Sequence, residues 1–395
     1  MNVIYVGTVP PNHIVEEIKG LGSYIDYATL TFQNALVAGL DYWYPNMRIL
    51  SDIRVDEYPK VKKVIFKPEE YSHKDGGEKD DRFVRIVNIP LLKRIFLFID
   101  KRREIKKMLR EGEKNVIIMY SLPSSQLLAV ASLRKQLYKS CLVIPDLPEF
   151  MSSKRDLIRR MAKSIDRKLI EWSIRRMDTF VLLSSHMAER LPLEGKKWKQ
   201  MEGIYQPSAI SINFKKTPTK TILYTGTLGE RYGIGDLLKA FRLIDSPDYR
   251  LLIRGGGEMK DEVIRLSKVD SRIQYVEPLS KEDLLRLQMS STVLVNPVRR
   301  SQDFTRYFFP SKTMEYLASG TPVVMYHLDC IPKDYDEYIN YIAEETIESL
   351  RDKIVEVCES KSEESNARAA KAATFIKEKK NAVVQTKVIY DLINE

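Results

Sequence analysis

Short runs of consecutive apolar residues recur along the chain, and stretches with helical spacing separate them. In the first half the apolar runs lie at 3–6, 115–120, 141–144 and 179–184. Continuous apolar runs are typical of strands in a parallel sheet that helices cover on both faces. The pattern of the first half therefore predicts a doubly wound α/β domain.

The same alternation begins again after a polar stretch, 196–220, which contains Pro207 and Pro218 and which we expect to link two domains. Predicted strands at 221–224, 250–253, 273–276, 293–295 and 322–325 alternate with predicted helices. A chain of 395 residues is also too long for one compact core. We therefore expect two α/β domains in series, with a ligand in the cleft outside the carboxyl ends of the strands.

Glycine-containing loops follow the predicted strands of the second half. The loops 226–233, 255–257 and the one that leads to Pro310 should open on the same edge of the sheet, where glycine lets a backbone approach a ligand closely. Taken alone, 255–257 is equally consistent with a tight turn. None of these loops has the spacing of a dinucleotide-binding fingerprint or a P-loop, so neither site is supported.

The stretch 308–324 predicts a loop, a short helix and a strand. We expect Pro310 at the first helical position, and Gly320 and Pro322 close the helix. The helix N-terminus, with Ser311 and Lys312, can hold an anion, and Glu315 one turn further can hold hydroxyl groups. Phosphate and sugar hydroxyls together describe a nucleotide. The alternatives are that Glu315 only complements the helix dipole and that Lys312 is only solvated.

The sequence FPSKTMEYLASGTPVV resembles the donor-binding motif of family 4 glycosyltransferases of the type that builds bacterial polysaccharides, which are retaining enzymes of the GT-B fold. The stretches YTGTLGERYGIGDLLKAF, LLIRGGGEMKDEV and YVEPLSKEDLLRLQMSSTVLVNP agree with it in order, whereas the first half agrees loosely, through RRMDTFVLLSSHMAERL. The resemblance implies two Rossmann-like domains that face each other across a cleft. It divides the chain into 1–205, 206–378 and a helical segment, 379–395, that crosses back to the first domain.

The resemblance also implies roles for individual residues. It places Glu315 on the ribose, Val276 on the base through its backbone, and Ser311 and Lys312, with nearby backbone N–H groups, on the diphosphate. The remaining donor nucleotide-binding residues that we expect are Gly226, Gly255, Gly256 and Pro310. In the first domain it places Asp146 opposite the sugar and Gly7 and Thr8 near the phosphate and acceptor, with His13 on the acceptor side. An Asx turn in Pro-Asp-Leu-Pro is the alternative for Asp146, and a helix-start residue is the alternative for His13.

Three positions depart from the family pattern. Tyr307 stands where the family often has a glutamate that contacts the sugar, and Thr227 and Tyr232 stand where it has a phosphate-binding arginine and lysine. Arg231 can supply the missing charge, unless it forms a surface salt bridge. Of the arginines in the loop before Pro310 (Arg299, Arg300 and Arg306), we expect one to reach the phosphates and two to be solvated.

The main catalytic contribution that we expect from the donor-site residues is stabilisation of the negative charge on the departing nucleoside diphosphate. The resemblance implies Asp146, Arg231 and Lys312 as the catalytic residues and retention of the anomeric configuration. Because Arg231, Lys312 and the helix N-terminus at Pro310 can neutralise the leaving group, we expect no metal ion. We expect no cofactor either, and a UDP- or GDP-linked sugar as the co-substrate.

The amino-acid composition indicates what kind of partners the protein binds. The formal net charge of +10 and pI of about 9.2 favour anionic partners. Three separated cysteines and four unpaired histidines predict a reduced, cytoplasmic setting without structural zinc. The N-terminus lacks the basic region of a signal peptide, and no apolar run is long enough for a transmembrane helix.

The positive charge concentrates in two stretches of the first half. Residues 154–176 carry nine basic and three acidic residues, and 93–110 carry eight basic and two acidic residues. Basic amphipathic helices attach to anionic bilayers, so we expect Arg159, Arg160, Lys163 and Arg167 to face the inner surface of the cell membrane. An ordinary surface helix is the alternative reading. A peripheral location and a lipid-linked saccharide acceptor follow from this expectation.

The sequence thus predicts a metal-independent, retaining glycosyltransferase that moves a sugar from a nucleotide sugar to a lipid-linked oligosaccharide or polysaccharide. Two alternatives of the same fold stay open: a nucleotide-sugar epimerase or phosphorylase, and a non-catalytic partner subunit, which Tyr307 and Thr227 favour. We do not expect a nucleic-acid partner, because surface aromatics interleaved with the basic residues and any known binding module are missing.

Overall fold

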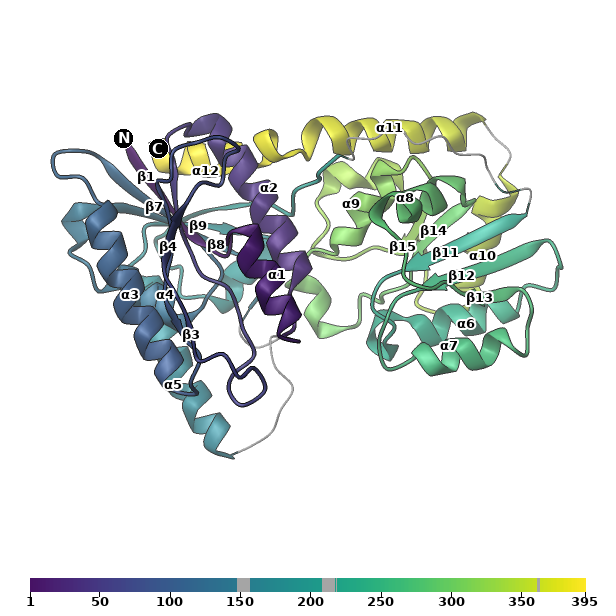
Figure 1. Ribbon diagram of the computed structural model, residues 1–395. Coiled ribbons are helices and arrows are strands. Elements are labelled where there is room, and N and C mark those ends of the chain that lie inside the picture. Colours follow the sequence, from purple (N-terminus) through teal and green to yellow (C-terminus); the bar gives the residue numbers. More distant parts are fainter. Residues whose placement is uncertain (148–156, 208–216, 218, 361–362) are drawn as a thin grey trace. The chain divides into compact units, whose positions relative to one another are not determined.

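The computed structural model describes residues 1–147, 157–207, 217, 219–360 and 363–395, and side chains of 157–163 lie outside this description. The chain forms two units (Figure 1). The first consists of Met1–Ile204 and Ala382–Glu395, and the second of Tyr205–Asn381. The C-terminal helix therefore belongs to the first unit, although 177 residues of the second unit precede it.

The first unit is built on one mainly parallel sheet with the strand order β10-β9-β8-β7-β1-β2-β5-β4, in which only β4 and β5 pair antiparallel. Its strands are β1 Asn2–Gly7, β2 Arg48–Ser51, β4 Glu69–Tyr71, β5 Asp81–Phe83, β7 Asn115–Tyr120, β8 Lys139–Ile144, β9 Thr179–Leu182 and β10 Lys197–Gln200. A separate antiparallel pair is formed by β3 Ile65–Phe66 and β6 Ile86–Val87. The central strands β1 and β7 are buried over their whole length, which explains their continuous apolar sequence.

Helices cover this sheet: α1 Asn12–Gly20, α2 Tyr27–Trp43, α3 Leu92–Met108, α4 Ser124–Ala131, α5 Leu157–Arg175 and α12 Ala382–Asn394, with short 3-10 helices at Lys135–Leu137 and Ser185–Arg190. The sequence analysis missed α2 and β2. The sequence at 83–88 predicts a single strand, but Asp81–Phe83 and Ile86–Val87 are separate strands in different sheets. The polar stretch 196–220, which we expected to link the domains, contains β10. Among the described residues, none of the helices combines the length and apolarity that a membrane crossing needs.

The second unit has a fully parallel sheet with the order β13-β12-β11-β14-β15-β16. Its strands are β11 Lys220–Thr225, β12 Tyr249–Arg254, β13 Ile273–Tyr275, β14 Val293–Asn296, β15 Val323–Tyr326 and β16 Ile339–Ile342. Its helices are α6 Ile234–Arg242, α7 Lys260–Ser267, α8 Lys281–Ser290, α9 Ser311–Ala318, α10 Ile347–Glu359 and α11 Glu363–Lys379, with 3-10 helices at Glu230–Tyr232, Asp303–Arg306 and Lys333–Tyr338. The predicted alternation of strands and helices in this half is confirmed.

A buried polar cluster in the first unit contains Asp81, at the end of the charged stretch 75–81. Residues 75–80 are exposed, as expected of a solvated turn, but Asp81 is only 2% exposed and begins β5. Asp81 accepts hydrogen bonds from the backbone N–H of Ile49 (2.7 Å) and lies 2.6 Å from Nδ1 of His73. Burial alone would lower the pKa of His73, but the hydrogen bonds to Asp41 and Asp81 outweigh it and raise this pKa to about 9. Asp81 is therefore part of the framework.

The C-terminal helix α12 packs tightly against α2. A Cβ atom on Gly39 would lie 2.3 Å from the carbonyl oxygen of Ala382, so only glycine permits this approach. Trp43 at the end of α2 donates a hydrogen bond from Nε1 to the carbonyl of Val383 (3.1 Å), and its ring lies 4.9 Å from that of Tyr390. These contacts fix the end of the chain to the first unit.

We expect Gly39→Ala to lower the free energy of unfolding by about 1–3 kcal/mol, because the added methyl group overpacks the contact between α2 and α12. The matched control is Gly20→Ala, at the end of α1, where an added Cβ would meet no atom within 4 Å. This control should leave stability unchanged or raise it by up to about 1 kcal/mol. Urea unfolding followed by circular dichroism measures both, and equal stabilities of the two variants would contradict the packing argument.

Candidate functional site

The candidate site lies in the second unit, at the carboxyl ends of β11 and β12. The backbone N–H of Gly226 donates to the carbonyl of Arg254 (3.0 Å), and that of Leu228 donates to the carbonyl of Gly256 (2.9 Å). A Cβ atom on Gly255, where φ is +154°, would lie 1.7 Å from the carbonyl oxygen of Gly226. The loops after β11 and β12 therefore pack directly on each other at one edge of the sheet, and their contact requires glycine.

A tyrosine hydroxyl attaches α9 to the same edge. The Tyr316 hydroxyl accepts a hydrogen bond from the backbone N–H of Thr225 (2.7 Å) and donates one to its carbonyl (3.1 Å). Burial raises the pKa of this hydroxyl, so it stays protonated and can donate. The sequence analysis missed Tyr316 and placed Pro310 inside the helix, whereas Pro310 is the N-cap and Ser311 begins α9.

Lys312 brings a positive charge to the ends of the strands. Its Nζ lies 3.0 Å from the Tyr224 hydroxyl and 4.3 Å from the centre of that ring. A Cβ atom on Gly226 would lie 2.5 Å from Nζ, so the missing side chain leaves room for the ammonium group. Desolvation lowers the pKa of Lys312 to about 8, although Glu315 partly opposes this effect. Within the described part of the chain Lys312 forms no ion pair.

Glu315 lies one turn beyond Lys312 and remains accessible to solvent. Desolvation raises the pKa of its carboxyl, and the charges of Lys312, Lys281 and Arg254 lower it in part. Two further polar side chains at this edge have unsatisfied atoms: Nε of Arg254 and both amide atoms of Asn296 are buried without a hydrogen-bond partner among the residues that the structure describes. Buried polar atoms of this kind call for a water or a ligand.

The remaining predicted residues of this half are placed as follows. Val276 donates its N–H to the carbonyl of Ile253 (2.8 Å), so only its carbonyl is left for a base. Arg231 is exposed and donates to the Tyr232 hydroxyl (2.6 Å). The arginines of the loop before α9 all lie near carboxylates: Arg299 is 2.7 Å from Asp236, and Arg300 and Arg306 are 2.8 and 3.5 Å from Asp329.

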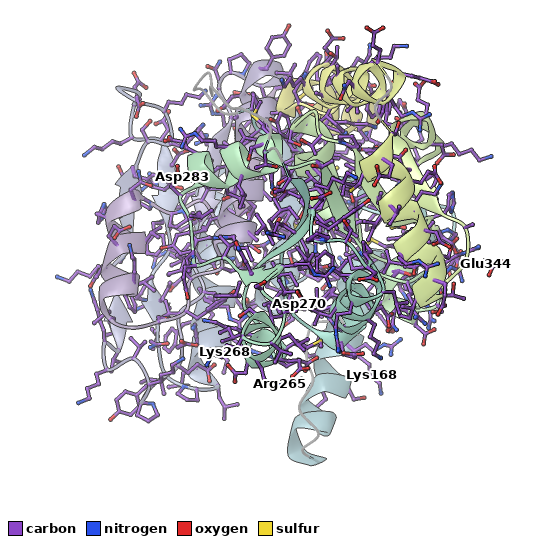
Figure 2. The ribbon with its side chains drawn as sticks, turned by 90° about the vertical axis from the view of Figure 1, so that its right-hand side faces the viewer. Lys168, Arg265, Lys268, Asp270, Asp283 and Glu344 are labelled. Atoms are coloured by element: carbon purple, nitrogen blue, oxygen red, sulfur yellow. The ribbon has the colours of Figure 1, made fainter. Side chains whose placement is uncertain are left out.

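Figure 2 shows Arg265, Asp270 and Asp283 on the surface of this unit. Arg265 lies 2.7 Å from Glu262, Asp270 lies 2.8 Å from Arg272, and Asp283 lies 2.6 Å from Arg286. In the described ranges, no group of three or more histidine, cysteine, aspartate or glutamate side chains could hold a metal ion. Lys312 differs from these paired surface charges because it is desolvated and forms no ion pair among the described residues.

In the first unit, the carboxyl ends of β1 and β8 carry the other predicted residues. Thr8 donates its backbone N–H to Oε1 of Gln33 (2.7 Å), which also accepts from the Tyr5 hydroxyl (2.9 Å). Gln33 thus holds the loop after Gly7, a role that no local sequence signal reveals.

Asp146 and His13 differ in their surroundings. Asp146 is exposed beyond the end of β8, yet partial desolvation and the charge of Asp26 raise the pKa of its carboxyl. His13 lies on the surface, where its Nε2 is 3.0 Å from a carboxylate oxygen of Glu69. The side chains of Arg159, Arg160 and Lys163 lie outside the described residues, and Arg167 is paired with Glu171 at 2.8 Å.

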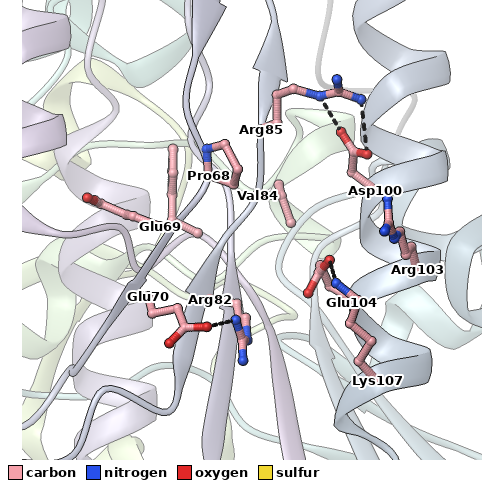
Figure 3. A pocket seen from close by; sticks show the side chains of 11 residues that line it. Pro68, Glu69, Glu70, Arg82, Val84, Arg85, Asp100, Arg103, Glu104 and Lys107 are labelled. Atoms are coloured by element: carbon pink, nitrogen blue, oxygen red, sulfur yellow. Dashed lines mark hydrogen bonds and ion pairs between the residues drawn. The ribbon is translucent and has the colours of Figure 1, made fainter.

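A cavity of about 580 Å³ lies in the first unit between the β4–β5 hairpin and α3 (Figure 3). Arg82 pairs with Glu70, Arg85 with Asp100 at 3.0 Å, and Lys107 with Glu104 at 2.7 Å. Because these charged side chains pair with each other, they are less available to a charged ligand than Lys312 at the edge of the sheet in the second unit.

Comparison with known proteins finds one matching family, which covers most of the second unit. Residues 219–360 match the family described as Glycosyl transferases group 1. No protein of curated function matches the sequence.

Several solved structures share the fold over the whole chain. S. aureus TarM, solved as a mutant in complex with fondaparinux, alpha-GlcNAc-glycerol and UDP, is 10% identical with a TM-score of 0.62, covering 100% of both chains. The lipopolysaccharide outer core galactosyltransferase WaaB is 15% identical with a TM-score of 0.61, covering 100% of this chain and 99% of its own. Anabaena HepE in complex with UDP is 11% identical with a TM-score of 0.60, covering 100% of both chains. The fold is therefore GT-B, and together with the matched domain it supports a glycosyltransferase enzyme.

We expect the affinity for UDP or GDP to fall above pH 8 in the wild-type protein. A bound diphosphate stabilises the ammonium form of Lys312, whose pKa in the free protein is about 8, so binding must take up a proton at higher pH. The affinity should change little between about pH 7 and 8, where the terminal phosphate is largely ionised, and fall by up to about tenfold per pH unit above pH 8.

Calorimetric titrations between pH 6.5 and 9.5 measure this dependence. Lys312→Met should bind more weakly and lose it, while the control Lys239→Met, an exposed lysine on α6, should keep it. A wild-type profile without a decline above pH 8 would contradict the role of Lys312.

Proposed function

We propose that this protein is a retaining glycosyltransferase that transfers a sugar from a UDP- or GDP-linked donor to a lipid-linked oligosaccharide or polysaccharide. The observation that carries the proposal is the position of Lys312 and Glu315 on one short helix, beside the packed loops of Gly226 and Gly255. An ammonium group and a helix N-terminus suit a diphosphate, and an accessible carboxylate one turn further suits vicinal hydroxyl groups.

The diphosphate leaves as a polyanion, so its stabilisation is the main chemical task. Lys312 is already desolvated before the anion arrives, which strengthens its attraction without further reorganisation. Arg231 and the backbone N–H groups at Ser311 and Lys312 add donors. Because these groups neutralise the leaving group, the proposed reaction requires no metal ion.

The other roles follow from the same arrangement. Glu315 accepts hydrogen bonds from the ribose hydroxyls, and the free carbonyl of Val276 accepts one from the base. Retention corresponds to attack of the acceptor on the face from which the diphosphate departs, with the departing phosphate taking the acceptor proton. In the first unit we assign Asp146 to the face opposite the sugar, Gly7 and Thr8 to the phosphate and acceptor, and His13 to the acceptor side.

Glu315→Ala should weaken the binding of UDP or GDP by about tenfold to 100-fold, the value of lost hydrogen bonds to a charged group. Glu315→Gln keeps an oxygen that can accept a hydrogen bond, so its affinity for UDP or GDP should lie between those of the wild type and Glu315→Ala. The control is Glu348→Ala, which removes a glutamate from the first turn of α10 and only alters a helix dipole.

Isothermal titration calorimetry measures the affinities, and release of nucleoside diphosphate from a panel of nucleotide sugars with membrane lipid extract measures turnover. Unchanged affinity in Glu315→Ala would refute the ribose assignment. Binding without release from any donor would favour a non-catalytic subunit, consistent with a buried Tyr307 in place of a glutamate.

The membrane part of the proposal rests on the outer surfaces of α3 and α5. Large apolar side chains are exposed at Leu91, Leu92, Ile95 and Ile99 and at Ile165, Leu169 and Trp172. Arg94 of α3 lies 3.2 Å from Asp166 of α5, so the two helices adjoin. Exposed apolar side chains among many basic ones suit the interface of an anionic bilayer.

Reversing Arg159, Arg160 and Lys163 to glutamate should lower binding to phosphatidylglycerol vesicles at least about tenfold, since each basic residue near such a surface contributes about 1 kcal/mol. Vesicle co-sedimentation at low salt measures this. The control reverses Lys353, Lys371 and Lys377 of the second unit and should keep the binding. If both triple variants bind like the wild type, the membrane assignment fails.

A further inference from the structure

Three partly exposed aromatic side chains form a cluster beside the candidate site. The rings of Tyr232 and Phe304 are 5.8 Å apart and nearly perpendicular, and those of Phe304 and Phe308 are 5.2 Å apart. Tyr232 ends the 3-10 turn after β11, Phe304 lies in the turn Asp303–Arg306, and Phe308 directly precedes the N-terminal region of α9. Two loops far apart in the sequence thus combine their aromatic side chains.

A guanidinium group completes the cluster. The Arg231 guanidinium lies 4.8 Å from the centres of both the Tyr232 and Phe304 rings, and it donates to the Tyr232 hydroxyl. Stacking on two rings fixes the orientation of this exposed arginine while leaving most of its donors free. We call Arg231, Tyr232, Phe304 and Phe308 the aromatic platform.

Phe308 does not contribute its side chain to the core, in contrast to the residues on either side of it. Its neighbours Tyr307 and Phe309 are each only 5% exposed and fill the interior, whereas Phe308 remains partly exposed on the platform. Tyr307 occupies the position where a carboxylate would contact a sugar, and its burial removes it from that task. Phe308 therefore presents an aromatic surface at this loop.

The platform adjoins the place of Lys312. The phenol of Tyr232 is close enough to Tyr224 to contribute to the raised pKa of that residue, and the Tyr224 hydroxyl contacts Nζ of Lys312. The loop is also firmly placed, since a Cβ atom on Gly233 would lie 2.1 Å from the carbonyl oxygen of Pro297. A diphosphate on Lys312 would put its next substituent near these rings.

We propose that the aromatic platform is the subsite for the sugar of the donor, a neutral pyranosyl group that packs its C–H face on Phe304 and Phe308. This inference rests on the proposed function. An aromatic ring presents a negative face, and the C–H groups on one side of a pyranose carry partial positive charge, so the two surfaces attract each other. Arg231 donates hydrogen bonds to the sugar hydroxyls or to the adjoining phosphate.

The test compares the affinities of UDP and GDP with those of their glucosyl, N-acetylglucosaminyl, galactosyl and mannosyl derivatives by calorimetry. At least one nucleotide sugar should bind the wild type more tightly than its nucleoside diphosphate. Phe308→Ala should reduce this gain by about fivefold to tenfold, the range of one aromatic contact, and leave the affinity for the diphosphate unchanged. Phe304→Ala also removes a ring on which Arg231 stacks, so it should lower the affinity for the diphosphate too, but by less than the affinity for the nucleotide sugar. The control is Phe375→Ala. It removes a ring of α11 that stacks on Tyr338, with the ring centres 4.7 Å apart, and it should change neither affinity.

Each other result has a defined meaning. Equal losses for the nucleoside diphosphate and the nucleotide sugar would make the platform a structural support of the loop and overturn the inference. No change in either variant, or no gain from any sugar in the wild type, would overturn it as well while the proposed nucleotide site stands. A wild-type protein that binds no nucleoside diphosphate would overturn the proposed function and the inference together.

Discussion

The desolvated ammonium group of Lys312 is the constraint on which the candidate site depends. A lysine in such surroundings loses hydration, and its lowered pKa records that loss. The face and hydroxyl of Tyr224 compensate for part of it, but no carboxylate in the described chain pairs with it directly. The charge is therefore held ready for an anion that comes from outside.

The surrounding backbone positions the ammonium group of Lys312 at the end of β11. Gly226 leaves the volume that Nζ occupies, and Gly255 lets the next loop pack behind it. The Tyr316 hydroxyl joins α9 to the end of β11 through both backbone groups of Thr225, so the helix that carries Lys312 cannot drift along the sheet. Position and electrostatics are thus determined by a few short contacts, which makes the site preorganised.

The order of the buried strands could be predicted because central strands such as β1 and β7 are apolar throughout. The helix α2 could not, because Gln33, Ala35, Leu36, Val37, Gly39 and Leu40 are all buried, and burial on several sides removes the single apolar stripe. The strand β10 has the sequence KWKQ, and its exposed edge position gives it no apolar run.

The same distinction applies to the site. The glycine loops and the residues Lys312 and Glu315 lie in local motifs, so the sequence revealed them. Tyr316 and Gln33 act on backbone groups 91 and 25 residues away, and such partners become visible only when the chain is folded. The pairing of Arg299, Arg300 and Arg306 with Asp236 and Asp329 likewise depends on tertiary contacts.

The bridge between Tyr205 and Asn381 has a consequence for how such a protein can be assembled and altered. The backbone N–H of Tyr205 donates to the carbonyl of Lys380 (2.8 Å), so the first and last residues of the second unit lie side by side. In topological terms the second unit is an insertion into the first, and its entry and exit share one point. A segment with adjoining ends can be replaced as one block through two crossovers in the coding sequence, which would transfer the whole donor side while the strands and the terminal helix of the first unit stay intact.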